Sequence, residues 1–320
     1  MEAQPLADLL QALADPTRLR ILALLRRMEL SVGELAIILD QSQPRVSRHV
    51  RILADAGIVE RRREGSWVFL TIAPEERTDP MFALVDAWAD APSEEAFQSD
   101  ASKLDRIRTD RAEAAGRYFS SHADTWDSIR SLHVAESEVE EAIGRALGDQ
   151  PLGRLVDIGT GTGRMIELFG RSALQSVGID RSSEMLRLAR VKLEAAGIPS
   201  SLRQGDMYAL PLDDCSADTV IIHQVLHYAH SPAAAIDEAS RVLAPGGRLL
   251  IVDFAAHERE ELRTTDAHIR LGFDDQTMAT WFKAAGISVE QVEHLEGGEL
   301  TVTLWLGAKA GVRQRQRRAA

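Results

Sequence analysis

Apolar residues recur at the spacing of amphipathic helices over the first 56 residues of the chain. The spacing predicts four helices, over 6–13, 16–27, 31–39 and 42–56. Asp15-Pro16 is a helix-start signal, because aspartate caps a first turn and proline fits it. Ser31 and Glu34 form a capping box for the third helix, and Gly57 ends the fourth. The pattern predicts a small helical domain here.

Strand-like alternation follows the last of these helices. Apolar and polar residues alternate over 58–61 and 67–70, with a turn at 64–66, which predicts a β-hairpin. A further apolar helix is expected over 81–89. The N-terminal domain is therefore expected to be mostly helical, with one small β-ribbon.

A polar, charged segment separates the two halves of the chain. Leu104 and Ile107 keep some helical spacing within it, so we expect a helical connector with few core residues. The basic tail is expected to be disordered, either as a solvated end or as an arm that binds phosphate. We expect a first domain over 1–90, the connector over 91–117, a second domain over 118–310 and the tail over 311–320.

Strands and helices alternate regularly in the second half of the chain. Apolar strands are expected over 155–159, 176–180, 201–206, 219–224 and 248–254, with helices between them that include 182–196 and one from Pro232. Such alternation indicates a parallel sheet with helices on both faces. The segments 287–296 and 299–309 flank a Gly297-Gly298 turn and predict a closing antiparallel hairpin. The second domain is expected to have a Rossmann-like α/β fold.

Composition and length fit a two-domain globular protein. The chain has 320 residues, of which 45% are hydrophobic and 27% are charged. No apolar run reaches the ~18 residues of a membrane span, and the N-terminus lacks a signal pattern, so we expect a cytoplasmic protein. The single cysteine, Cys215, excludes an internal disulfide and a multi-cysteine metal site, and no metal is expected. Its polar surroundings favour an ordinary thiol over a nucleophile.

The overall negative charge conceals a local basic region. The net charge is −12, yet residues 41–69 contain six arginines against three acidic residues. In the 42–56 helix, Val46, Val50 and Leu53 form the apolar stripe. The other face then carries arginine, glutamine and serine, the side chains that contact base edges and phosphates in the major groove. The DNA-contact candidates on this helix and on the β-ribbon are Gln43, Arg45, Ser47, Arg48, Arg51, Arg61, Arg62 and Arg63.

The run from ALADPTRLRILALL through ELAIILDQSQPRVSRHVRILADAGIVERRREGSWVFL resembles the winged helix-turn-helix ArsR/SmtB family of bacterial repressors. The resemblance implies a homodimer that reads palindromic double-stranded DNA and releases it when an inducer binds. The first helix and 81–89, with Phe82, Val85 and Trp88, are either dimer surfaces or ordinary core. Leu30 and Val32 stand where arsenic-sensing members carry cysteines, so soft-metal sensing at that site is excluded.

A glycine loop, VDIGTGTGR, follows the first strand of the second domain. Gly159, Gly161 and Gly163 form G-x-G-x-G, but Arg164 stands where the dinucleotide fingerprint needs Gly or Ala. Asp157 and Asp180 lie at successive strand ends. A carboxylate at the second of these positions can accept both hydroxyls of a ribose, and open α/β sheets bind ligands at this edge. Each aspartate could alternatively be a helix cap or turn residue.

Asp206 follows the third strand with Met207 beside it, and His223 and Gln224 end the fourth strand. These segments, together with RVLAPGGRLLIVDF, resemble class I S-adenosylmethionine-dependent methyltransferases of the ubiquinone/menaquinone type. That fold has a mostly parallel seven-stranded sheet with a terminal antiparallel hairpin. The expected contacts with S-adenosylmethionine or S-adenosylhomocysteine are Asp157, Gly159, Thr160, Gly161, Gly163, Asp180, Arg181, Met185, Asp206, Met207, His223 and Gln224, and further pocket candidates are Tyr118, Trp126 and Arg130.

Cofactor binding leaves open whether the domain transfers a methyl group. His223 and His227 are candidate bases, although a histidine after a strand is more often structural. The IIHQ stretch lacks the Asn/Asp-Pro-Pro-aromatic motif of nucleic-acid amino-methylation, and one cysteine does not suffice for arsenite methylation. Two hypotheses remain. The protein is either a DNA-binding regulator that senses S-adenosylmethionine or S-adenosylhomocysteine, or a small-molecule methyltransferase with an attached DNA-binding domain.

Overall fold

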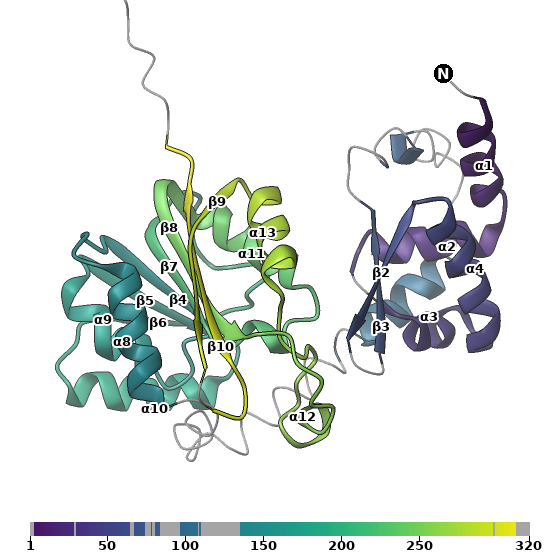
Figure 1. Cartoon of the computed structure of the whole chain (residues 1–320). Coiled ribbons are helices and arrows are strands. Elements are labelled where there is room, and N and C mark those ends of the chain that lie inside the picture. Colours follow the sequence, from purple (N-terminus) through teal and green to yellow (C-terminus); the bar gives the residue numbers. More distant parts are fainter. Residues whose placement is uncertain are drawn as a thin grey trace, which may run out of the picture. The chain divides into compact units, whose positions relative to one another are not determined.

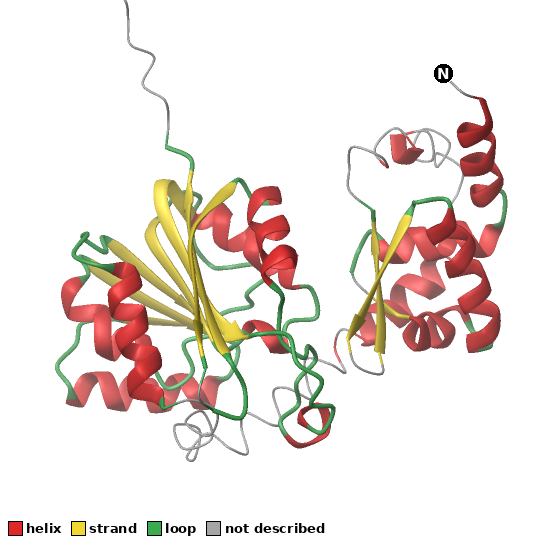
Figure 2. Ribbon diagram, in the orientation of Figure 1, coloured by secondary structure: helices red, strands yellow, loops and turns green. Residues whose placement is uncertain are grey.

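The computed structural model describes residues 3–28, 30–64, 67–73, 78, 81–83, 97–107, 109, 135–296 and 298–311. The chain divides into two compact units, residues 1–113 and 114–320, and each is described by itself. The first is mostly helical with a small sheet, and the second is built around a large sheet (Figures 1 and 2).

The first unit contains the predicted helices and the β-ribbon. Its labelled elements are α1 (Ala3–Leu13), α2 (Pro16–Leu25), β1 (Leu30–Ser31), α3 (Val32–Leu39), α4 (Gln43–Asp55), β2 (Val59–Glu64) and β3 (Trp67–Ile72). The strands form a three-stranded antiparallel sheet in the order β1-β3-β2. The pattern of the sequence did not predict β1, because two residues are too few to show a period. The winged helix-turn-helix fold is confirmed.

Local capping fixes the helix boundaries of this unit. The side chain of Asp15 accepts a hydrogen bond from Arg18 N at 3.1 Å. The predicted capping box is present, since Ser31 Oγ accepts from Glu34 N at 3.2 Å and Glu34 Oε2 accepts from Ser31 N at 2.8 Å. Gly57, just after α4, has a positive φ of 68°. A left-handed residue of this kind ends a helix most easily as glycine.

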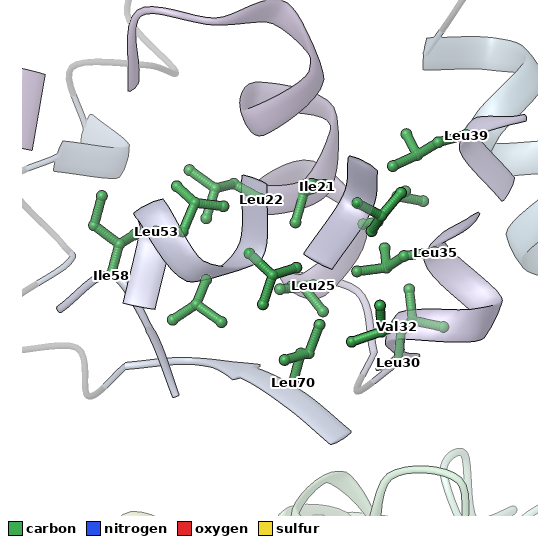
Figure 3. Packing of buried hydrophobic residues seen from close by; sticks show 14 of the residues in the cluster. Ile21, Leu22, Leu25, Leu30, Val32, Leu35, Leu39, Leu53, Ile58 and Leu70 are labelled. Carbon is green, nitrogen blue, oxygen red and sulfur yellow. The ribbon is translucent and has the colours of Figure 1, made fainter. Parts of the chain in front are cut away.

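One hydrophobic core joins the helices to the sheet (Figure 3). Ile21, Leu35, Leu53 and Leu70 are all fully buried in it. Phe82 lies in the same core with an exposed fraction of 9%, and the guanidinium of Arg26 lies 4.5 Å from its ring centre. Phe82 is therefore a residue of the unit's own core. Of the predicted 81–89 helix only 81–83 is described, so Val85 and Trp88 lie outside the described residues.

The described part of the expected connector belongs to the first unit. Residues 97–107 are helical, as predicted, but Leu104 is fully buried in the core of this unit and Ile107 packs against it. These are the two apolar residues that keep helical spacing in the sequence, and together with an ion pair they hold the helix on this unit.

The second unit contains a seven-stranded sheet in the order β6-β5-β4-β7-β8-β10-β9. The strands are β4 (Arg154–Ile158), β5 (Gln175–Asp180), β6 (Ser201–Gln204), β7 (Ala217–His223), β8 (Leu243–Phe254), β9 (Ile287–Leu295) and β10 (Val302–Lys309). The pairs from β6 to β8 are parallel, and β10 is antiparallel to both β8 and β9. The predicted Rossmann-like sheet with a closing antiparallel hairpin is confirmed.

Helices cover both faces of this sheet (Figure 2). Its helices are α8 (Glu136–Leu147), α9 (Arg164–Phe169), α10 (Ser183–Ala195), α11 (Pro232–Val242), α12 (Leu262–Thr265) and α13 (Asp275–Ala284), with 3-10 turns η2 (Gly170–Ser172) and η3 (Leu226–Tyr228). Along β8, Leu249 and Ile251 pack in the cluster that includes α11 and α13 residues, whereas Leu250 and Val252 pack in the cluster that includes α8 residues. Alternate side chains of a strand point to opposite faces, which explains why β8 is apolar over 249–252, where both faces are covered.

No helix among the described residues is both long enough and apolar enough to cross a membrane.

Candidate functional site

The α4 helix presents the predicted polar face. Val46, Val50 and Leu53 are buried as expected, with exposed fractions of 0–1%. On the other side of the helix, Ser47 is half-buried. The exposed candidates on this helix are Gln43, Arg45, Arg48 and Arg51. The helix thus combines an apolar stripe that fixes it on the core with a row of donors that remains open to solvent.

Residues before α4 fix its position. Asp40 has a left-handed backbone with φ 53°, which turns the chain between α3 and α4. Gln41 Nε2 donates to Thr17 Oγ1 at 3.3 Å, and His49 Nδ1 lies 3.7 Å from an oxygen of Asp15. The Gln41 hydrogen bond holds the start of α4 against the beginning of α2. Burial lowers the pKa of His49, so this side chain is mainly neutral near neutral pH.

The β-ribbon supplies the other DNA-contact candidates. Arg61 is exposed on β2 and pairs with Leu70 of β3 across the ladder. Arg62 and Arg63 lie on the same strand, and their side chains are outside the described part of the structure. The wing therefore carries consecutive arginines, as predicted.

The glycine loop lies between β4 and α9, at the carboxyl end of the sheet. The amides of Gly159 and Thr160 both donate to the carbonyl of Ile179, at 2.8 and 3.0 Å. Gly159 has a φ of 72°, and a Cβ there would lie 2.6 Å from a methyl carbon of Val225. Glycine is required at this position both by the backbone and by the neighbouring side chain. Gly163, with φ 84°, is the N-cap of α9.

Asp157 and Asp180 lie at the ends of adjacent strands and both contact this loop. Asp157 is 1% exposed, and its Oδ2 accepts from Thr160 Oγ1 at 2.6 Å. Asp180 Oδ2 accepts from Gly161 N at 2.8 Å, and its Oδ1 accepts from Ser182 N at 2.8 Å. The Asp180 carboxylate therefore joins the glycine loop to the start of α10. Burial raises the pKa of Asp180, although the hydrogen bonds from Ser182 and Gly161 act in the opposite direction.

The ladder register brings three strand ends to one level. Ile158 pairs with Ile179 on one side and Ile222 on the other. The following residues, Gly159, Asp180 and His223, are consequently neighbours at the carboxyl edge. His223 and Gln224 are buried, with exposed fractions of 8% and 9%.

The remaining cofactor candidates differ in exposure. Asp206 is exposed and accepts from Tyr208 N at 3.0 Å, and Met207 is half-buried. Arg181 is exposed, whereas Met185 is 1% exposed inside α10. Met185 therefore serves the packing of α10 here rather than presenting its side chain to solvent. Tyr118, Trp126 and Arg130 lie outside the described residues.

A buried histidine–aspartate pair lies next to this edge. His227 Nδ1 is 2.7 Å from Asp253 Oδ1, and His227 N donates to Asp253 Oδ2 at 3.2 Å. Both side chains are almost fully buried, and the His227 ring contacts those of Tyr228 and His268. His227 Nε2 has no hydrogen-bond partner among the described residues. Sequence reasoning missed Asp253, because it lies 26 residues away at the end of β8.

Arg164 is engaged in structural ion pairs. Its guanidinium bonds both oxygens of Glu140 on α8, at 2.6 and 2.8 Å, and Glu167 at 2.8 Å. These hydrogen bonds raise the pKa of Arg164, despite the opposing effect of burial. The residue that departs from the dinucleotide fingerprint therefore fixes α8 against α9.

The second unit has a cavity of about 520 Å³ at the opposite ends of its strands. Its walls include Arg154 and Gln175, which begin β4 and β5, and Arg203 with the 210–213 loop. No described helix lies between β6 and β7, and the 210–213 loop of this connection forms part of the cavity wall. The cavity lies at the amino ends of the strands, away from Asp157 and Asp180.

Comparison with known proteins identifies both units. The model of the ArsR family of bacterial regulatory proteins matches residues 15–61. The arsenical resistance operon repressor of Escherichia coli is 37% identical over 101 residues, which are 31% of this chain and 79% of the repressor. The chain belongs to the ArsR family. This ArsR-family protein also has a second unit, where a methyltransferase-domain model matches residues 156–251.

Further relatives include a methyltransferase and a transposon-encoded protein. The demethylmenaquinone methyltransferase of Thermus thermophilus is 33% identical over 141 residues, which are 42% of this chain and 64% of the enzyme. A 37.1 kDa protein encoded in a Streptomyces fradiae transposon is 31% identical over 209 residues, 59% of this chain and 60% of that protein. The chain thus spans less than two thirds of either. A Haloferax volcanii methyltransferase, solved with its Trm112 activator, has a TM-score of 0.50 at 21% identity and covers 60% of this chain and 97% of its own, which shows the shared fold.

Proposed function

We propose that this ArsR-family protein is a transcriptional repressor whose methyltransferase unit binds S-adenosylmethionine or S-adenosylhomocysteine as the sensed ligand. The proposal rests chiefly on the Asp180 carboxylate, which lies at a strand end and bonds the glycine loop at Gly161. Its two oxygens accept from the amides of Gly161 and Ser182, and a carboxylate offers about four acceptor positions, so it can also accept ribose hydroxyls. Such charge-assisted hydrogen bonds are the strong ones in ligand sites.

Other residues of the same edge complete the proposed ligand site. The exposed carboxylate of Asp206 can accept from the adenine amino group, with Met207 beside the ring. Asp157, which orients Thr160, supports the loop from beneath. Gly159 allows the left-handed backbone of the loop and the close packing of Val225 against it.

DNA reading is assigned to α4 and the wing. Arg48 and Arg51 are exposed one turn apart on α4, and Arg61 is exposed on β2. Arginine can bind a guanine edge or a phosphate, and glutamine suits adenine. We propose that two copies of the chain read the half-sites of a palindrome, as the two-fold symmetry of such regulators requires.

Acidification is expected to weaken binding of S-adenosylhomocysteine at a higher pH than an ordinary aspartate would allow. Burial raises the pKa of Asp180 above that of an ordinary aspartate, and the ionised carboxylate is the stronger acceptor for both ribose hydroxyls. The affinity is therefore full above this raised pKa and is lost as the pH falls through it. Calorimetric titrations at a series of pH values test this, and the Asp180→Asn variant should lose this component of the pH dependence.

A direct binding experiment tests the two halves of the proposal. The purified full-length chain selects a DNA duplex from a random-sequence pool, and calorimetry then measures its affinity for each cofactor form. We expect an enriched palindrome and saturable binding of at least one form. A pool that stays random, or a chain that binds neither form, would overturn the corresponding half.

A second candidate function, active methyl transfer, is favoured by the His227–Asp253 pair. Asp253 orients the His227 imidazole through Nδ1. The buried Nε2, which has no hydrogen-bond partner among the described residues, is suited to take a proton from the molecule that receives the methyl group. In this case His227 acts as a base, and Asp253 is a positioning residue.

A turnover assay separates the two functions. If His227 is a base, release of S-adenosylhomocysteine from S-adenosylmethionine with a metabolite extract should fall ~10²–10⁴-fold in His227→Gln at unchanged cofactor affinity. The sensor account predicts no extract-dependent release from the wild-type chain. His294→Gln, on β9 with Asp275 as its partner, is the matched control. Extract-dependent turnover that only His227→Gln abolishes would establish the enzyme.

A further inference from the structure

The 97–107 helix packs one face against the helix-turn-helix of the first unit. Asp105 and Arg106, on its other face, are exposed. Positions separated by three, four and seven residues share one side of a helix. The residues of the buried stripe are Asp100, Lys103, Leu104 and Ile107. The winged-helix resemblance accounts for residues up to about 90, so this packed helix is an addition to that fold.

The first contact of this stripe is a buried ion pair with α2. Arg20 donates from Nε and Nη2 to the two oxygens of Asp100, both at 2.6 Å. The Asp100 side chain is 3% exposed, and its hydrogen bond with Arg20 raises the pKa of that guanidinium. A buried pair of this kind is costly to break, because separation leaves a charge without a partner.

The second contact is with the end of α3. Lys103 Nζ donates to the carbonyl of Ile38 at 3.0 Å, in the last turn of that helix. Carbonyls in a last turn have no partner within the helix, and a positive charge there interacts favourably with the negative end of the helix dipole. The left-handed Asp40 follows two residues later and leads into α4.

Both contacts reach the elements that position the DNA-reading helix. Arg20 lies one turn beyond Thr17, whose hydroxyl accepts from the side chain of Gln41 just before α4. Ile38 lies just before the same turn, at its α3 side. We call the Arg20–Asp100 pair and the Lys103–Ile38 hydrogen bond the anchor contacts.

We infer that the 97–107 helix is the element that couples the two units, so that ligand in the methyltransferase unit changes DNA affinity by shifting the anchor contacts. The helix and Thr109 are the last described part of the first unit along the chain, and the second unit's first described helix begins at Glu136. A shift of this helix would break both the Arg20–Asp100 ion pair and the hydrogen bond from Lys103 to the Ile38 carbonyl. This inference rests on the proposed sensor function.

Variants of the anchor contacts test the coupling. Asp100→Asn removes the charge from the ion pair at constant shape, and Lys103→Met removes the ammonium but keeps an apolar stem. The matched controls are Asp105→Asn and Arg106→Met, on the exposed face of the same helix. The full-length chain is titrated with the DNA duplex that it selects, without ligand and with saturating S-adenosylhomocysteine. Circular dichroism and ligand affinity report whether each variant is folded.

We expect the anchor variants to change the DNA affinity without ligand about fivefold or more. The ratio of DNA affinity with saturating S-adenosylhomocysteine to DNA affinity without it should then be close to one. Ligand affinity and both controls should stay at the wild-type level. If folded Asp100→Asn and Lys103→Met keep the wild-type ratio of DNA affinities with and without ligand, the coupling inference is overturned and the sensor function is not. A wild-type ratio of one would overturn the sensor function and the coupling together. If Asp100→Asn does not fold, Lys103→Met alone decides.

Discussion

Replacement of Asp180 by alanine is expected to weaken S-adenosylhomocysteine binding by about a hundredfold or more. The variant loses an acceptor for two ribose hydroxyls, and hydrogen bonds to a charged group contribute roughly 1.5–3 kcal/mol each. It also loses the carboxylate that accepts from both Gly161 N and Ser182 N and so holds the loop beside α10. Isothermal titration calorimetry of the full-length chain measures the change.

Glu184→Ala is the matched control for this variant, since Glu184 is an exposed acid in the first turn of α10. We expect its affinity to stay within about twofold of wild type, because a single exposed charge contributes little. If Asp180→Ala binds the ligand as tightly as Glu184→Ala does, the site is not at this edge of the sheet.

Replacement of Arg48 by alanine is expected to have the largest effect on DNA binding. A well-placed arginine contact with a base contributes ~1–3 kcal/mol, or roughly 5–150-fold in affinity, and a dimer loses it at both half-sites. The loss should be greatest for the selected palindrome and small for random duplex. Fluorescence anisotropy with both duplexes measures the ratio.

Arg106→Ala serves as a control for Arg48→Ala, and Arg61→Ala serves as a comparison for a phosphate contact. Arg106 lies on the 97–107 helix, outside α4 and the wing, and its variant should bind like wild type. Arg61→Ala should weaken selected and random duplexes alike and reduce the salt dependence by about one phosphate contact. An Arg48→Ala effect that is equal on both duplexes would assign Arg48 to the backbone rather than to bases.

The sequence predicted those parts of the fold that depend on local signals. The Ser31–Glu34 capping box and the end of α4 at Gly57 follow from backbone requirements only a few residues long. The parallel sheet follows from the regular alternation of apolar strands with helices, and the hairpin of β9 and β10 from two strands around a glycine turn. Each of these patterns determines its structure without long-range information.

Contacts between distant residues could not be predicted in the same way. The Arg20–Asp100 pair joins residues 80 apart, and no periodic pattern indicates which of many charges will meet. The same holds for His227 and Asp253. For this reason the 97–107 helix was expected to be a connector, although it packs on the first unit.

The candidate ligand site could be predicted in part, because it depends both on local signals and on contacts between distant residues. Strand-end positions predicted that Asp157 and Asp180 would be neighbours, and the ladder register places them on adjacent strands. Their hydrogen bonds to Thr160 and Gly161 depend on the path of the loop, which the glycines permit but do not determine. Met185 is an expected cofactor contact, but its side chain is buried in α10, and the sequence alone does not show which residues of that helix point inward.

The central claim is that ligand in the methyltransferase unit controls DNA binding by the first unit. It is tested most directly by the affinity of the full-length chain for its selected duplex, measured while each cofactor form is added in turn. The account predicts that one form changes the affinity at least about fivefold, and that Asp180→Ala removes this response while its ligand-free DNA affinity stays at the wild-type level. Saturable ligand binding with no change in DNA affinity for either form would contradict it.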